Sequence, residues 1–291
     1  ELRLRWEEGA VYELSTTSDQ VIEQTIAGRQ NKIEQKITMN YTFSVKDVDD
    51  SGTATVSIVY DAVKMQQRMS NGMAFSYDST DTDAPVPAAA KGFAGLVGRG
   101  FELSMTPEGK VTEIQGVDAM IDALIEGMDQ VNPAMKSQMR DAFKRQFGET
   151  AIRENMENMM GFYPDEKVAV GDSWESSMRL TSAMPAEINA KWTLKERFDG
   201  KVRIDMASTV EPLEDAEPMD MGPMQLKYEL SGEQNGYLVL DEKTGWTEES
   251  EINQEFSGVI HALNMPGAEE SSMDWPMSIK GILRTESNRV E

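Results

Sequence analysis

Few residues in this chain are of the types that carry out chemistry. The only histidine is His261, in the stretch FSGVIHALNMPG, and there is no cysteine. A Ser–His–Asp triad would have to use His261, yet that stretch shows no Gly-x-Ser-x-Gly nucleophile elbow. Catalytic zinc generally needs two or three imidazole or thiolate ligands, and at most one is present. We therefore predict no catalytic residue, no metal site and no cofactor, with His261 structural or exposed.

The acidic residues offer oxygen ligands for calcium and carboxylates for acid–base chemistry. The stretch DVDDSGTATVSI begins like an EF-hand loop, with Asp47, Asp49 and Gly52 in the expected places. Its twelfth position is Ile58 instead of a bidentate glutamate, so we predict a hairpin turn. The stretch DSTDTD at 78–83 is interpreted as a solvated acidic loop. Paired carboxylates could hydrolyse glycosides at separations of roughly 5–10 Å, but no spacing among the acids singles out a pair.

Methionine is abundant, with 21 residues. Unbranched thioether side chains fill irregular cores and also line adaptable apolar binding surfaces. Core packing is the favoured interpretation; an apolar ligand or partner groove is the alternative, and copper binding by MDMGPM (219–224) is a third. For the groove, the candidate ligand contacts are Met120, Leu124, Met128, Met135, Met139 and Phe143.

Two periodicities indicate which elements would position these side chains. In KIEQKITMNYTFSVK (32–46), apolar residues from Ile33 to Val45 share one parity and polar residues hold the other, as in an antiparallel strand with one wet face. Between 117 and 161, apolar residues fall three and four apart, which predicts two to three amphipathic helices. Residues 78–100 are rich in Pro, Ala and Gly, which predicts a long loop.

The order of elements after Gly171 repeats the order after Gly9, which predicts an internal duplication. We expect an α+β, mainly β fold of duplicated antiparallel curved sheets, half-barrel-like, with a central helical insert that covers the apolar concave face. The first β-unit would span 1–116, the insert 117–161 and the second β-unit 162–291. One continuous sheet and two packed units both fit this pattern, and two packed units are favoured.

Charge limits the partners. With 28 basic and 51 acidic residues, the net charge is −23, so the surface would repel nucleic acid and anionic membranes. No apolar run approaches the roughly 18 residues of a transmembrane helix. The chain begins at Glu1, which is compatible with a removed export signal. A basic stripe on the second expected helix would dock on acidic residues of the same molecule or on an anionic partner; it consists of Lys136, Arg140, Lys144 and Arg145.

A short marker carries a family resemblance. The stretch PDEKVAVGDSWE contains Val168, Gly171, Asp172 and Trp174, and Gly245 follows in a later hairpin. This pattern resembles an uncharacterised family of exported bacterial proteins, described only as a domain of unknown function. The resemblance covers most of the chain and implies a periplasmic, outer-envelope or secreted location without an established activity. The expected architecture is also similar to the bacterial lipoprotein-carrier fold, which holds lipid chains between sheet and helices, although fold does not determine function.

The favoured function is that of an exported, non-enzymatic protein binding an apolar small molecule, a lipid or another envelope component between sheet and helices. One alternative is a structural or protein-interaction module that presents sheet edges or residues 78–100 to an envelope protein. The weakest alternative is a carboxylate-based hydrolase. The sequence specifies neither the ligand nor the oligomeric state.

Overall fold

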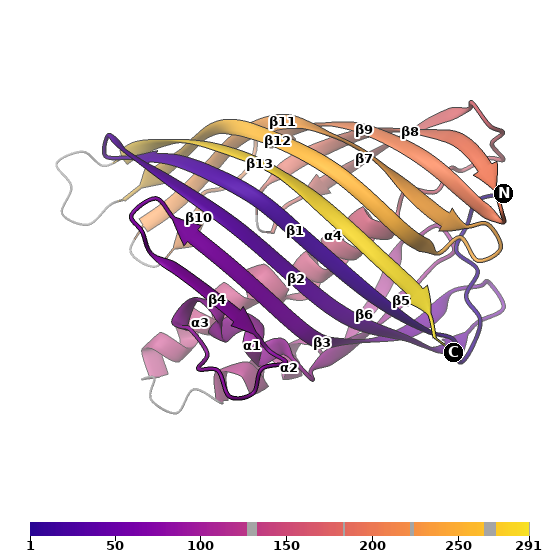
Figure 1. The fold of residues 1–291 in the computed structure, drawn as a ribbon, viewed down its shortest axis with the longest axis horizontal. Helices are drawn as coiled ribbons and strands as arrows, with labels where there is room; N and C mark the ends of the chain where they lie inside the picture. Colours follow the sequence, from indigo (N-terminus) through magenta and orange to yellow (C-terminus); the bar gives the residue numbers. More distant parts are fainter. Residues whose placement is uncertain (127–132, 183, 222–223, 265–271, 291) are drawn as a thin grey trace.

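The strands form one 13-stranded antiparallel sheet in a computed structural model, which describes residues 1–126, 133–182, 184–221, 224–264 and 272–290 (Figure 1). The strands are β1 (Val11–Ile26), β2 (Arg29–Val48), β3 (Ala54–Met69), β4 (Ala74–Asp78), β5 (Gly100–Met105), β6 (Val111–Gln115), β7 (Ser173–Leu180), β8 (Ala186–Phe198), β9 (Lys201–Pro212), β10 (Met219–Met221), β11 (Met224–Asp241), β12 (Thr247–Leu263) and β13 (Ser272–Arg289). Their order is β6-β5-β3-β2-β1-β13-β12-β11-β9-β8-β7, with β4 paired to β3 and β10 paired to β11.

The two halves of the chain join because its first and last strands pair. β1 and β13 are antiparallel neighbours from Tyr12, opposite Arg289, to Gln24, opposite Met277. The preference for two separately packed units is therefore wrong, since the pairing satisfies backbone groups that would otherwise form two open edges. The mainly-β antiparallel fold with a helical insert is confirmed. The domain division at 116 and 161, and the duplication itself, stay predictions.

Local turn chemistry explains two of the hairpins. Ala27 and Gly28 both have positive φ, 49° and 74°, as a tight two-residue hairpin turn between β1 and β2 requires. The Asp49 carboxylate accepts hydrogen bonds from the backbone N–H groups of Ser51 (2.8 Å) and Thr53 (2.9 Å), which folds the turn between β2 and β3. The predicted hairpin at this acidic stretch is confirmed.

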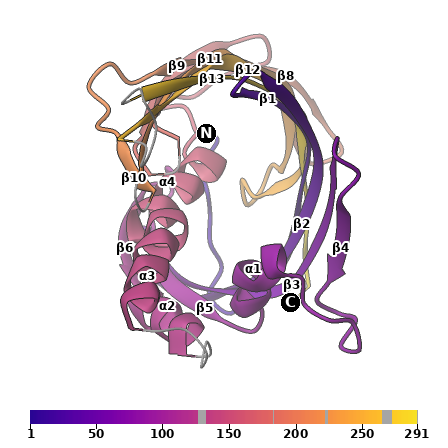
Figure 2. The same ribbon diagram turned by 90° about the vertical axis from the view of Figure 1, so that its left-hand side faces the viewer.

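The sheet curls around the helices (Figure 2), and its two edge strands, β6 and β7, both contact the same helix, α4. The helices are η1 (Ala88–Ala90), α1 (Lys91–Leu96), α2 (Val117–Glu126), α3 (Pro133–Phe147) and α4 (Glu149–Met160). In its described residues the insert thus has three helices, within the expected two to three. The long loop predicted at 78–100 is partly wrong: η1 and α1 form there because Leu96 is fully buried and Phe93 packs on the core beside it.

Helix α4 connects the two sheet edges through side-chain hydrogen bonds. On the β6 side, the backbone N–H of Val111 donates to the Glu157 carboxylate (2.9 Å), and Arg153 donates to the Val111 carbonyl. Beyond β7, Glu154 accepts from the backbone N–H groups of Thr181 (2.7 Å) and Ser182 (3.1 Å) and from both hydroxyls. The open seam of the curled sheet is therefore bridged by one helix.

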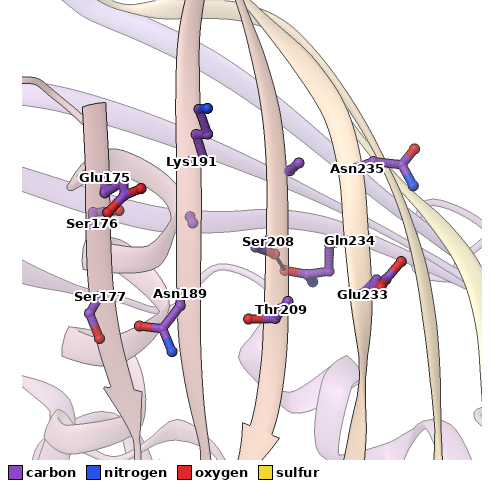
Figure 3. A pocket seen from close by; sticks show the side chains of 12 residues that line it. Glu175, Ser176, Ser177, Asn189, Lys191, Ser208, Thr209, Glu233, Gln234 and Asn235 are labelled. Atoms are coloured by element: carbon purple, nitrogen blue, oxygen red, sulfur yellow. Dashed lines mark hydrogen bonds between the residues drawn. The ribbon is translucent and has the colours of Figure 1, made fainter. Parts of the chain in front are cut away.

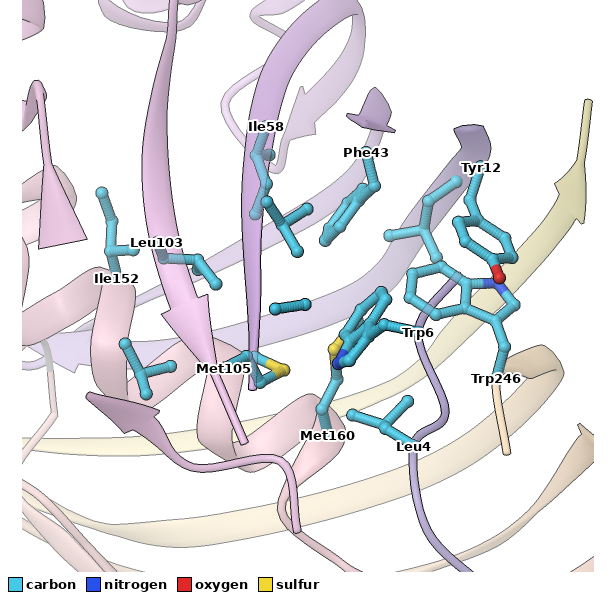
Figure 4. Close-up of a cluster of buried hydrophobic side chains, with 14 of the residues drawn as sticks. Leu4, Trp6, Tyr12, Phe43, Ile58, Leu103, Met105, Ile152, Met160 and Trp246 are labelled. Carbon is cyan, nitrogen blue, oxygen red and sulfur yellow. The ribbon is translucent and has the colours of Figure 1, made fainter. Parts of the chain in front are cut away.

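The N-terminal segment closes one end of the molecule. Leu2, Leu4 and Trp6 are buried. The backbone N–H of Leu4 donates to the Pro107 carbonyl (2.9 Å), in the turn between β5 and β6, while that of Arg5 donates to the Thr244 carbonyl (2.7 Å), between β11 and β12. Around this segment lies an aromatic cluster in which Tyr12 stacks on Trp246 at 4.3 Å between ring centroids, with Trp6 and Phe43 edge-on to the same indole (Figure 4). Buried apolar and aromatic side chains thus fill one end of the curled sheet.

Candidate functional site

A cavity of about 450 Å³ lies between the sheet and the helices, next to the aromatic cluster, of which Phe43 and Trp246 line it. This volume is within the range of small-molecule sites. The sheet and its turns contribute Leu14, Thr16, Met39, Tyr41, Phe43, Ile58, Tyr60, Phe101, Trp192, Leu238, Trp246, Thr247, Ser250, Ile252, Leu283 and Thr285. The remainder of the chain contributes Leu4, Phe93, Gln146, Phe147, Ile152, Asn155, Met156, Asn158, Met159, Met160 and Tyr163.

None of these lining residues is an acid, a base or a histidine, although 27 % of the chain is charged. The lining tyrosines stay neutral phenols, because burial raises the pKa of Tyr41 to about 12 and also raises the pKa values of Tyr60 and Tyr163. The cavity therefore offers apolar surface, a few hydroxyls and amides, and no carboxylate, imidazole or amine for acid–base catalysis.

Away from the strand ends, the inner face of the sheet carries no charged residue in the described strands; by strand pairing, Arg29, Arg197 and Arg289 share this face only at strand ends. On β1, the even-numbered residues from Tyr12 to Ile26 share the face of the cavity, and none is charged. On β12 the same holds from Ser250 to Ala262. The alternate positions of these two strands carry the charges, for example Glu23 on β1 and Glu255 on β12. Alternation therefore assigns the charges to the outer face.

Four of the six candidate ligand contacts from the sequence have described side chains, and these four are not among the residues that line this cavity. Met120 and Leu124 are buried in the packed core, where α2 lies against α1 and β5. Met139 and Phe143 are half-buried against the same core. Met128 lies outside the described residues, and Met135 lies in the first turn of α3, with its side chain outside the described part of the chain. The role of these six residues in ligand binding stays a prediction.

Sequence reasoning missed the helix that does face the cavity. Ile152, Met156, Met159 and Met160 of α4 line it, at the three- and four-residue spacing of one helix face. Apolar residues three and four apart also occur in α2 and α3, which carry the candidate residues, so spacing alone could not identify α4 as a helix that lines the cavity. The aromatic lining from Trp192 and other strand residues is likewise brought together only by sheet pairing.

The Gly-Asp-x-Trp stretch, 171–174, forms the turn that leads into β7. Gly171 has φ +96°, and the Asp172 carboxylate accepts a hydrogen bond from the backbone N–H of Ala169 (2.8 Å). The Trp174 indole donates to the Phe162 carbonyl (2.7 Å). These contacts fasten the connection between α4 and β7 beside the cavity.

A second, more open hollow of about 690 Å³ crosses β7, β8, β9 and β11 (Figure 3). Its charged lining residues, Glu175, Lys191 and Glu233, come from three different strands. No group of three or more His, Asp or Glu side chains in the described part of the chain is placed to hold a metal ion. We assign no chemistry to this hollow.

The remaining candidates from the sequence lie outside the cavity. His261 is paired with Asp274 (2.7 Å) and Glu229 (3.2 Å) at charged positions of β13 and β11. In the basic stripe, Arg140 pairs with Asp122 and Lys144 with Asp118, each at 2.8 Å, so two of its four cations dock on α2. Within the described ranges, no helix has the length and apolar character needed to cross a membrane.

Comparison with known proteins gives a family and a fold. One family model, described as "Family of unknown function (DUF6263)", matches residues 51–247, about two thirds of the chain. No curated protein matches. A solved structure concerned with lipid–protein interactions in lipovitellin is similar with a TM-score of 0.50 and 9% identity, covering 97% of this chain and 25% of that one. This chain therefore spans a quarter of the lipovitellin chain, and the likeness concerns fold alone.

Two bacterial structures are more distant. A domain assigned to outer membrane lipoprotein sorting, from Vibrio parahaemolyticus, has a TM-score of 0.14 and 5% identity over 92% of this chain and 84% of that one. A DUF1329 family protein from Desulfovibrio piger has a TM-score of 0.15 and 9% identity over the same shares of the two chains. At these scores neither structure supports an argument about this molecule.

Proposed function

This chain belongs to the family of unknown function DUF6263, and we propose that it is a non-enzymatic protein that binds an apolar small molecule or a lipid between its curled sheet and its helices. The observation that carries the proposal is the uncharged cavity of about 450 Å³. Apolar surface of this kind gains free energy when a ligand displaces its water, at about 25 cal/mol per Å². A site for acid–base catalysis would instead need groups that ionise near neutral pH, and no carboxylate, imidazole or amine lines the cavity.

The fold gives further support. A solved protein of similar fold, lipovitellin, is described in terms of lipid–protein interactions, and its likeness spans almost the whole of this chain. A curled antiparallel sheet with an apolar inner face is suited to a water-insoluble ligand, because the outer face alone keeps the protein in solution. The carboxylate-based hydrolase finds no carboxylate in the cavity. An interaction module that presents residues 78–100 to a partner is less well supported, since α1, within that stretch, packs into the core.

We propose a periplasmic, outer-envelope or secreted location for the protein, with no nucleic-acid partner. The support is the resemblance carried by Val168, Gly171, Asp172 and Trp174, together with the net charge of −23. Fractionation of cells expressing the full gene tests the location, and recovery in the cytoplasm alone would overturn it.

A filled cavity gives the direct test of binding. Ser250 is buried on the inner face of β12, and Ser257 is exposed on the outer face of the same strand. We expect the neutral fluorescent probe phenylnaphthylamine to bind the wild-type protein and to quench Trp192 and Trp246, which line the cavity. Ser250→Phe should weaken binding about tenfold, or about 1.4 kcal/mol, because the added ring occupies ligand volume.

The matched change Ser257→Phe should leave binding unchanged, since it adds the same ring outside. Thermal unfolding of both variants verifies that each is folded. Failure of the wild-type protein to bind the probe, or equal binding by Ser250→Phe, would count against the proposal. Mass spectrometry of an organic extract of the purified protein adds a test for a co-purifying ligand.

A further inference from the structure

A row of amide and hydroxyl side chains crosses the inner face next to the cavity. Strand pairing aligns Ser176, Ala190, Ser208, Gln234, Gln254, Gly281, Gln20, Gln35 and Gln67, one residue from each of nine neighbouring strands. We call this row the amide belt. Its five glutamines are neither fully buried nor fully exposed. Within it, Gln20 Nε2 donates to Gln35 Oε1 and Ser208 Oγ donates to Gln234 Oε1, each at 3.0 Å.

The amide belt separates two apolar bands of the same face. On the side of the closed end, Trp192, Ile252 and Leu283 line the cavity. They stand two residues from the belt along their strands, which is about 7 Å. On the side of the belt away from the N-terminal segment, the next row consists of apolar residues and one glycine. These are Met178, Ile188, Val210, Gly232, Phe256, Ile279, Ile22, Ile33 and Met69. The carboxamide groups of these strands are thus concentrated at one level between two mainly apolar rows, whereas the cavity beyond contributes hydroxyls from the sheet, such as those of Thr16, Ser250 and Thr285.

The helices add the same chemistry where the cavity meets solvent. Of the residues that line the cavity, three are exposed: Gln146, Asn155 and Asn158. Exposed lining residues mark the opening, and all three are carboxamides. Their neighbours Met156 and Met159 are half-buried. The cavity opening is therefore bordered by uncharged groups that both donate and accept hydrogen bonds.

We propose that the natural occupant is a neutral amphiphile of the acylglycerol class, with acyl chains on the apolar bands and its ester and hydroxyl groups at the amide belt. This deepens the function proposed above and rests on it. Ester carbonyls accept from amide N–H groups, and a hydroxyl also donates to amide oxygens, so the belt can satisfy both. A phosphate at the same level would be partly desolvated without the Lys or Arg partner that such a group requires, since the belt and the inner-face rows on either side of it contain neither residue.

Headgroup selectivity gives the test. The binding of dioctanoylglycerol, dioctanoyl phosphatidylglycerol and hexadecane to the purified protein is measured by displacement of phenylnaphthylamine. We expect dioctanoylglycerol to bind at least about tenfold more tightly than the phospholipid, which carries the same chains. Equal or tighter binding of the phospholipid would overturn the inference. Binding of hexadecane without dioctanoylglycerol would also overturn it while leaving the proposed function intact, and binding of none of the three would remove both.

Matched charge variants locate the selectivity at the belt. Gln234 and Gln254 are cross-strand partners on the inner face, whereas their neighbours Asn235 and Asn253 are partners on the outer face. The double change Gln234→Glu with Gln254→Glu should weaken dioctanoylglycerol binding about tenfold, while Asn235→Asp with Asn253→Asp should leave it unchanged. Circular dichroism verifies folding.

If the inner pair prevents folding, Gln254→Glu alone is compared with Asn253→Asp, with a severalfold loss expected from the former. Unchanged affinity in a folded inner variant would overturn the placement of the polar group at the belt. Equal losses in the inner and the outer variants would overturn it as well.

Discussion

The inner and outer faces of the sheet are built from the same strands, but the inner face is mainly apolar whereas the outer face carries most of the charged side chains. On β12, Ile252 and Phe256 face the cavity side, while Glu251 and Glu255 alternate with them on the other. The outer acids pair across strands, as Glu251 does with Arg284 at 2.8 Å. Such exposed pairs contribute little stability. Burial of apolar side chains on the inner face contributes to stability and forms the proposed binding surface, whereas the outer face carries most of the charged groups.

The largest effect should come from placing a charge on each face in turn. Ala54 of β3 is completely buried on the inner face, and Ala207 of β9 is exposed on the outer face. Ala54→Asp should cost more than about 4 kcal/mol of unfolding free energy or prevent folding, because the carboxylate has no partner in the core. Ala207→Asp should change the unfolding free energy by less than about 0.5 kcal/mol. Urea unfolding measures both, and similar values would mean that the two faces are not distinguished as described.

An intermediate effect should follow when α4 is loosened from the seam between the two edges of the sheet, which keeps the inner face enclosed. Glu154 accepts four hydrogen bonds from Thr181 and Ser182, and Glu149 lies exposed in the first turn of the same helix. We expect Glu154→Ala to cost about 1–2 kcal/mol, as loss of hydrogen bonds to a charged acceptor does. Hydrogen exchange at β7 should accelerate at the same time. Glu149→Ala serves as the control, and equal losses in the two variants would show that α4 does not hold the edge.

The smallest effect belongs to the outer face and depends on pH. The hydrogen bond with Asp274, aided by Glu229, raises the pKa of His261 above its ordinary value near 6.5. A raised folded-state pKa means that the stabilisation is complete below about pH 6.5 and is lost as pH rises through the folded pKa. Lys227 is also nearby, paired with Glu229 at 2.9 Å.

His261→Gln should therefore lower the unfolding free energy near pH 5.5 and have less effect near pH 8.5. Because the pair is on the surface and solvent screens it, the difference should stay below about 0.5 kcal/mol. Thermal melts of both proteins at the two pH values measure it. A larger effect at the higher pH would contradict the assigned pairing.

The strands and the insert were predictable because their signals are local. Alternation from Ile33 to Val45 specified β2, and Asp49 with Gly52 specified the following turn. The cavity was not predictable residue by residue. Met120 and Met156 have the same helical spacing signal, but only Met156 faces the cavity, because α2 packs on β5 while α4 spans the seam. The amide belt was equally hidden, since Gln35 and Gln254 are brought to one level only by the sheet register.

The sequence by itself determined which side of an alternating strand such as 32–46 is apolar, because a side-chain period of two is a local property that needs no partner strand. It also determined the excess of acidic groups and the scarcity of catalytic side chains. Only the tertiary structure decided that β1 pairs with β13, that α4 closes the seam and that amides from distant strands align beside a cavity. Register and closure depend on long-range pairing and on how helices pack against the sheet, and one residue of slip would have turned every inner side chain outward.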